Sequence, residues 1–312
     1  MLQVIKHIDI KGKQKGIVSI AISNVIREFE ERAHVKSLKK LDVYVTTNPI
    51  AVCKIILNSG KRLKVKRHGE MREWVCGNKP NFSYWEKGKS PIIMLNANEE
   101  IFRTNNIQAI SGLFAHELMH LLNKQDGIED ILNEEMENAA DRIFYLLDRH
   151  KPKKPFTIER LLVSFTRVGS TMTLLIKDIL ANSRVMAFGF DNQLYENYKV
   201  VLENANKIFY TENGILNDLK KDKKHVLDDA FLAYIGLNMT WVTFKMFQNK
   251  RYLELKNMVN MKIPDVIRKN GKPVIEDMMN LRSGKDRKTI RKLLILAINN
   301  YYKTVEYFCK KL

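Results

Sequence analysis

The hydrophobic pattern changes near residue 105, and this change limits the folds that are open to the chain. Before it, a helical pattern at 17–33 is followed by short apolar runs that are typical of strands, at 41–46, 51–57 and 91–95. After it, apolar residues recur every 3.6 positions, which predicts helices at 105–124, 133–150, 157–182, 194–211, 223–248 and 285–311. We therefore predict an α+β fold, with a small mixed sheet in the N-terminal part and an all-helical C-terminal part.

A charged stretch with two prolines, at 150–155, interrupts the helical part. Proline ends the preceding helix, and Thr157 is a suitable residue to start the next one. A chain of 312 residues is long enough for two domains. We predict one domain at 1–150 and a second, helical domain at 151–312 that closes a cleft over the first.

The composition also bounds the location of the protein. The longest uncharged stretch, 230–244, contains polar residues and is shorter than the roughly 20 apolar residues that span a bilayer. The N-terminal segment does not resemble a secretory signal. Three cysteines, Cys53, Cys76 and Cys309, form no CxxC pair, which agrees with a reducing compartment. We expect a cytoplasmic protein without a membrane span.

An HExxH string within an apolar helical segment is the strongest sequence motif. His116 and His120 are four residues apart and so share one helix face, with Cβ atoms about 5–6 Å apart. Two imidazoles at this spacing suit one Zn²⁺ ion. Glu117 is rotated from that face by about 100°, where it can act as a general base without being a ligand. We predict a zinc site with Glu117 as its catalytic base.

A catalytic zinc site needs a third protein ligand. In the acidic segment 134–141, Glu137 and Asp141 are one helical turn apart. Glu137 can face the metal while Asp141 hydrogen-bonds the outer nitrogen of a ligating histidine, His116 in the favoured arrangement. Asp126 is the alternative ligand, because it lies six residues after His120, where metzincin peptidases carry theirs; Asn123 takes the place of their glycine.

HExxH followed by ExxAD resembles the zincin peptidases of the gluzincin group, including thermolysin-like and CAAX prenyl endopeptidases. The resemblance covers residues 105–145. It implies zinc held by His116, His120 and Glu137, Asp141 behind His116, Glu117 as base, and a peptide or protein substrate. The prenyl endopeptidases are embedded in membranes, and this chain departs from them in having no credible span.

Two further features concern substrate binding. The strand before the HExxH helix, at 92–98, is expected to present an edge to an extended peptide. Within it, Asn96–Ala97 resembles the segment by which thermolysin-like enzymes hold substrate backbone, and it also suits an ordinary asparagine turn. A hydrogen-bond donor for the transition state is expected from the helical part, and the candidates are His225, Tyr198, Tyr210 and Tyr234.

The net charge of +18 raises the question of a polyanionic partner. Basic residues gather at 61–67 and at 282–288, before a last helix in which Tyr302 and Tyr307 could stack on bases while Tyr301 and Phe308 are core residues. Nucleic acid is thus a possible partner that the pattern does not favour. The main prediction is a zinc metallopeptidase. The alternatives are a non-proteolytic binding or regulatory protein derived from a zincin, and a DNA-associated protease.

Overall fold

The computed structural model confirms the α+β prediction, because helices dominate and the strands form one small mixed sheet. It describes residues 2–32, 38–52, 81–85, 90–151, 154–205, 208–223, 225–281 and 283–312. The chain divides into unit 1, which is Met1–Lys124 with Arg184–Val201, and unit 2, which is Gln125–Ser183 with Leu202–Leu312. The boundary predicted at 150–155 stays a prediction. Across the described ranges, no helix has the length and apolar character needed to cross a bilayer.

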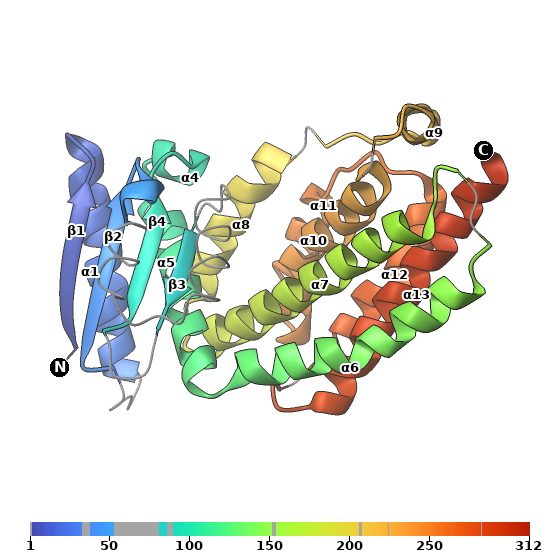
Figure 1. Cartoon of the computed structure of the whole chain (residues 1–312). Coiled ribbons are helices and arrows are strands. Elements are labelled where there is room, and N and C mark those ends of the chain that lie inside the picture. Colours follow the sequence, from blue (N-terminus) through green and yellow to red (C-terminus); the bar gives the residue numbers. More distant parts are fainter. Residues whose placement is uncertain are drawn as a thin grey trace. The chain divides into compact units, whose positions relative to one another are not determined.

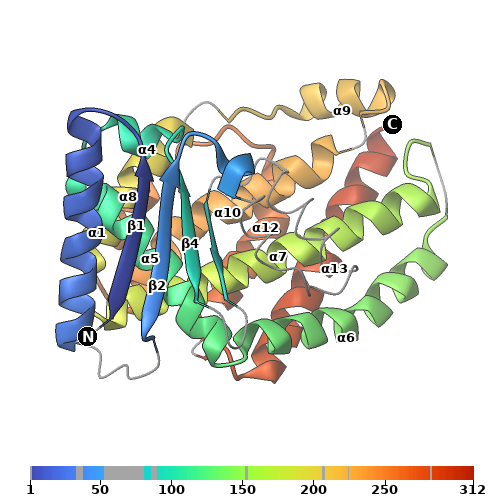
Figure 2. The same cartoon turned by 60° about the vertical axis from the view of Figure 1, so that its left-hand side comes forward.

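Unit 1 contains the sheet, whose strand order is β1-β2-β4-β3 (Figure 2). β1 pairs parallel with β2 and β2 with β4, whereas β3 is antiparallel to β4. The elements assigned wholly or largely to this unit are β1 (Gln3–Asp9), α1 (Lys13–Arg32), β2 (Lys40–Thr46), β3 (Asn81–Tyr84), β4 (Ile92–Asn96), α4 (Glu100–Arg103), α5 (Ile107–Gln125) and α8 (Asp191–Ala205).

The strand predictions at 41–46 and 91–95 are confirmed by β2 and β4. The strand predicted at 51–57 is wrong at its start, since Ala51 and Val52 lie in a helical turn, and residues 53–57 lie outside the described part. The expectation that 92–98 presents a free edge is also wrong. β4 lies between β2 and β3, so neighbouring strands occupy both sides of its backbone. The strand β3 has only four residues, too few for its polar and apolar alternation to have revealed it.

Helix α5, which carries the HExxH string, is packed tightly inside unit 1. The Ser111 hydroxyl donates a hydrogen bond to the carbonyl oxygen of Ala21 in α1, over 3.4 Å. On another side α5 approaches the start of α8 so closely that a Cβ atom at Gly112 would lie 2.0 Å from the carbonyl oxygen of Gln193. Near the start of α5, the Asn106 amide donates to Glu196 Oε2 over 3.1 Å. These contacts fix the position of α5 against α1 and α8.

We expect Gly112→Ala to lower the free energy of unfolding by about 2–3 kcal/mol, because backbone must shift to admit the added carbon. Gly16 in α1 provides the matched control, since a Cβ atom there would meet nothing within 4 Å. Gly16→Ala should be neutral or stabilise by up to about 1 kcal/mol. Urea denaturation measures both, and equal stability of the two variants would contradict this packing.

Unit 2 is helical, and its long helices lie side by side (Figure 1). Its elements are α6 (Ile128–Arg149), α7 (Ile158–Ala187, up to Ser183), α9 (Glu212–Lys220), α10 (Val226–Met246), α11 (Tyr252–Met258), α12 (Asp265–Met278) and α13 (Arg287–Lys311). The helices predicted after residue 105 are confirmed in kind, while α9, α11 and α12 are additional. Tyr301 and Phe308 are buried in the core as predicted.

A buried ion-pair network joins α6 to α13. Glu135 is fully buried and accepts hydrogen bonds from Arg291 Nε at 2.7 Å and from Arg287 Nη1 at 3.4 Å. The hydrogen bond from Arg291 holds the pKa of Glu135 below its usual value. Part of the acidic segment around the predicted ligand Glu137 therefore stabilises the helix packing of unit 2.

Candidate metal centre

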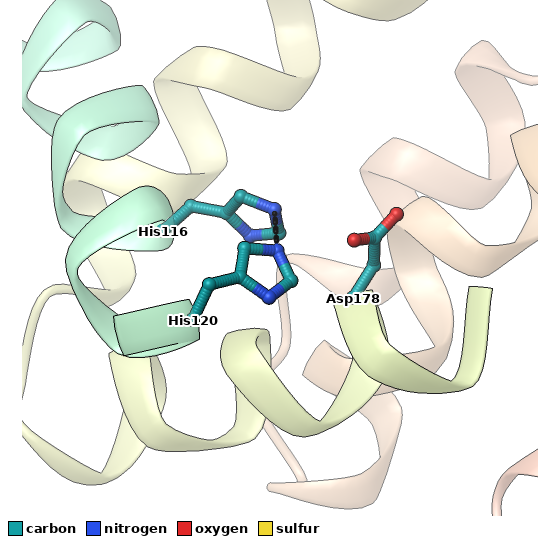
Figure 3. A group of neighbouring side chains, drawn as sticks. All are labelled: His116, His120 and Asp178. Atoms are coloured by element: carbon teal, nitrogen blue, oxygen red, sulfur yellow. Dashed lines mark hydrogen bonds between the residues drawn. The ribbon is translucent and has the colours of Figure 1, made fainter. Parts of the chain in front are cut away.

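The two histidines of the HExxH string converge on one point, as the i, i+4 spacing predicted. Their Nε2 atoms lie 2.9 Å apart, and the ring planes meet at 89° (Figure 3). His120 is buried and His116 is partly exposed. Two imidazoles bound to one tetrahedral Zn²⁺ would have their nitrogens roughly 3.3 Å apart, given Zn–N distances of about 2.0–2.1 Å. The pair is therefore arranged as two ligands of one ion.

Glu117 follows His116 directly and is buried, with 7% of its surface exposed. Within the part of the chain that the structure describes, its carboxylate accepts no hydrogen bond from another protein group. A carboxylate that protein donors do not hold can accept a proton from water, as a general base must.

Asp178 of α7 is the acid that is grouped with the two histidines as a possible metal ligand. One ligand atom of each of His116, His120 and Asp178 lies within 4.8 Å of the others (Figure 3). α7 is one continuous helix, and from Arg184 onward it belongs to unit 1. Asp178 lies six residues before Arg184, in the part of α7 that is assigned to unit 2.

The C-terminal end of α7, from Arg184 onward, packs within unit 1. Val185 is completely buried. Beyond the helix, the ring of Phe188 lies 5.7 Å from that of Phe29 in α1, and the Phe188 carbonyl oxygen accepts a hydrogen bond from Arg32 at 2.6 Å.

The acids that the sequence predicted as ligands have other surroundings. Glu137 and Asp141 are exposed on α6, and Asp126 is exposed just before it. Among the described residues, the histidines and Asp178 are the one group of three or more His, Cys, Asp or Glu side chains with metal-ligand proximity, and it contains none of these three acids. The roles predicted for Glu137, Asp141 and Asp126 stay predictions.

Asn123 is a polar residue in the buried part of α5. It is fully buried one turn after His120, and neither atom of its amide has a hydrogen-bond partner in the described structure. α5 continues through Asn123 to Gln125, and the left-handed turn falls at Gly127 instead. The turn expected of a metzincin at Asn123 is absent, which weakens Asp126 as an alternative ligand.

Glu99 is a second carboxylate near Glu117 that the sequence did not reveal. Burial raises the pKa of Glu99 to about 7; the hydrogen bond from Asn81 opposes this rise, and the negative charge of Glu117 adds to it. An acid with a pKa near 7 can hold a proton at neutral pH, and such groups cluster at functional sites.

The other residues singled out from the sequence have structural contacts. Asn96 ends β4, and its Oδ1 atom accepts a hydrogen bond from the Asn98 amide, as in an ordinary asparagine turn. His225 contacts the buried Asp228 at 3.2 Å, Tyr198 is buried, and Tyr210 and Tyr234 are partly buried. Their roles with a substrate stay predictions.

The basic segments are only partly described, and two of their described arginines are paired with acids. Residues 61–67 and Arg282 lie outside the described part. In α13, Arg287 and Arg291 pair with acids of α6, and the ring of Tyr302 packs near His150 and Phe165.

The donor set fits a metal ion of intermediate softness. Two imidazole nitrogens and one carboxylate form a three-ligand set of the kind seen at catalytic zinc sites. No protein-family model, curated protein or solved structure matches this chain.

Proposed function

We propose that this protein is a zinc-dependent hydrolase of peptide bonds, with Glu117 as its general base. The observation that supports this most directly is the convergence of the two Nε2 atoms at 2.9 Å beside a buried glutamate that accepts no hydrogen bond from the described chain. A helix that buried Glu117 and His120 for packing alone would lose stability, because each would need a partner.

We further propose that Asp178 replaces Glu137 as the third protein ligand. Its carboxylate is the one grouped with the histidines, whereas Glu137 is exposed on α6. Three protein ligands leave a fourth position open, as a catalytic zinc ion requires. This ligand set keeps the chemistry of the HExxH string but departs from the gluzincin pattern.

The reaction would be hydrolysis of an amide. When bound, Zn²⁺ would supply a Lewis acid that polarises the carbonyl group and lowers the pKa of water. A Glu117 oxygen accepts a proton from the attacking water as the new C–O bond forms. Glu117 then returns that proton to the departing amine nitrogen as the C–N bond breaks, so the carboxylate is regenerated.

The zinc site is tested first by metal content. We expect about one Zn²⁺ per chain after reconstitution, and loss of the bound ion in His120→Ala, because the remaining ligands cannot complete the site. His7→Ala is the matched control: this histidine is exposed on β1 and stacks on Tyr44. Metal analysis after dialysis measures all three proteins. Equal zinc content in wild type and His120→Ala would refute the proposed site.

A further inference from the structure

Unit 2 contains a cavity at the start of α7, separate from the residues of the candidate metal centre. Its volume is about 500 Å³, and its lining includes Pro155, Glu159, Val163, Asp222 and His225. The first three residues belong to the beginning of α7 and the segment before it, whereas Asp222 and His225 come from the segment between α9 and α10. All of the lining residues belong to unit 2.

Arg160 also lines this cavity, but its guanidinium group is held by the protein. Nη1 donates hydrogen bonds to the carbonyl oxygen of Pro155 at 3.2 Å and to Asp222 Oδ1 at 2.8 Å, and Nη2 donates to the carbonyl oxygen of Lys223 at 2.7 Å. The Arg160 side chain is only 10% exposed. The ammonium group of Lys223 is paired as well, with Asp218 at 2.7 Å. Arg160 therefore ties the start of α7 to the segment before α10, and its charge is balanced within the cavity wall.

His225 turns one ring nitrogen toward a buried acid. Its Nδ1 atom lies 3.2 Å from Oδ2 of Asp228, which is completely buried. The same Oδ2 atom accepts a hydrogen bond from Arg167 at 2.8 Å, so it acts as an acceptor and the His225 Nδ1–H group is the donor. In this tautomer the other nitrogen, Nε2, carries a lone pair. Because 44% of the His225 side chain is exposed and it lines the cavity, Nε2 can accept a hydrogen bond from a ligand.

The charges behind His225 leave one negative charge in excess. Arg167 pairs with Asp228 at 2.8 Å and with Asp229 at 2.5 Å, so two carboxylates share one guanidinium group. The Oδ1 atom of Asp228 is buried and accepts no hydrogen bond within the described structure. The field of this group therefore favours a cation near the His225 ring.

The cavity itself offers acceptors next to an apolar surface. Asp222 and Glu159 are exposed acids, and one arginine balances only one of them. Pro155 and Val163 supply the apolar part, and Val163 is 55% exposed. An arginine side chain has the complementary form, because its planar guanidinium group donates several hydrogen bonds and its methylene groups cover apolar surface.

We propose that this cavity binds a guanidinium group at the end of a short apolar chain, as an arginine side chain of a peptide presents it. Glu159, Asp222 and Nε2 of His225 accept its hydrogen bonds, and Val163 contacts its methylene groups. The chain as a whole carries a net charge of +18, so the acidic character is local to this cavity. The inference does not depend on the function proposed for the zinc site.

The first test uses the wild-type protein with butylguanidinium as the probe, and with butyrate and butanol as controls. Binding is followed by ¹H–¹³C NMR of the His225 ring, whose signals are identified among the seven histidines by their loss in His225→Gln. We expect butylguanidinium to shift these signals with a Kd of about 0.1–10 mM, which is within the range of a ligand of eight non-hydrogen atoms. Butyrate or butanol binding as tightly as butylguanidinium, or no shift with butylguanidinium, would overturn the proposal.

The second test changes the charge of the cavity. Asp222 is 74% exposed, so Asp222→Asn should keep a melting temperature near that of wild type. It removes the acid that balances Arg160. We therefore expect butylguanidinium to bind about 2- to 5-fold more weakly and butyrate to bind more tightly than in wild type. Glu254→Gln is the matched control, because this exposed acid of α11 is not part of the cavity lining. Unchanged affinities in Asp222→Asn, or an equal loss in Glu254→Gln, would contradict the proposed site.

Discussion

Glu117→Gln is expected to reduce peptide hydrolysis by about 10²- to 10⁴-fold, the usual contribution of a general base. Glutamine has nearly the same shape as glutamate but cannot accept the proton of the attacking water. Because Glu117 makes no hydrogen bond to the described chain and is not a ligand in this proposal, metal content and melting temperature should stay close to wild type. Steady-state kinetics, metal analysis and thermal denaturation measure the three quantities.

The activity, zinc content and melting temperature of Glu117→Gln together distinguish a general base from a metal ligand. A loss in kcat with little change in KM is the expected form, because proton transfer takes place in the transition state. If Glu117→Gln lost zinc as His120→Ala does, Glu117 would be a ligand and the assignment of roles in the HExxH string would be wrong. Unchanged kcat would exclude Glu117 as the base.

Asp178→Ala is expected to weaken zinc binding by more than about 100-fold, which exceeds the 10- to 100-fold effect typical of residues behind the ligands. Its carboxylate oxygen is one of the three ligand atoms that lie within 4.8 Å of one another. Glu137→Ala is the matched control, because that acid is exposed on α6 and should leave affinity nearly unchanged. Competition with a fluorescent chelator measures the two dissociation constants.

The order of the losses in zinc affinity among the three acid variants distinguishes three possible ligand sets. A larger loss in Glu137→Ala than in Asp178→Ala would restore the gluzincin ligand set, with Asp141 behind His116. Asp126→Ala completes the series, and a dominant loss there would indicate a metzincin-like site despite the helical conformation of Asn123. Asparagine at 178 offers a neutral oxygen in the same place, so Asp178→Asn should bind more tightly than Asp178→Ala.

The parts of the site that lie within one helix could be predicted from the sequence. The spacing of His116 and His120 fixes their common face once α5 forms, and the apolar residues around them indicate that α5 is buried. Asp178 could not be found in this way. It is one of two acids on a 30-residue helix. Helical periodicity tells which residues share a face, but not which other helix that face meets.

The sheet, too, could be predicted only in part from the sequence. β2 and β4 have buried, apolar residues and were predictable, whereas β1 has no fully buried residue and β3 has only four residues. The resemblance to zincins predicts an edge at β4, but the unpredicted strand β3 pairs with that side of β4. The contact between Asn81 and Glu99 depends on the same pairing of β3 with β4, so Glu99 could not be recognised from the sequence either.

The proposal of a peptidase is tested most directly by peptide cleavage. Zinc-loaded wild type, wild type stripped by a chelator, and zinc-loaded Glu117→Gln are incubated with a diverse peptide mixture, and new termini are read by mass spectrometry. We predict new termini with zinc-loaded wild type, at least about 100-fold fewer with Glu117→Gln, and none after chelation until zinc is restored. Cleavage that is equal in all three samples, or absent from wild type with zinc bound, would contradict the assignment; the second result would favour a non-proteolytic zinc-binding protein.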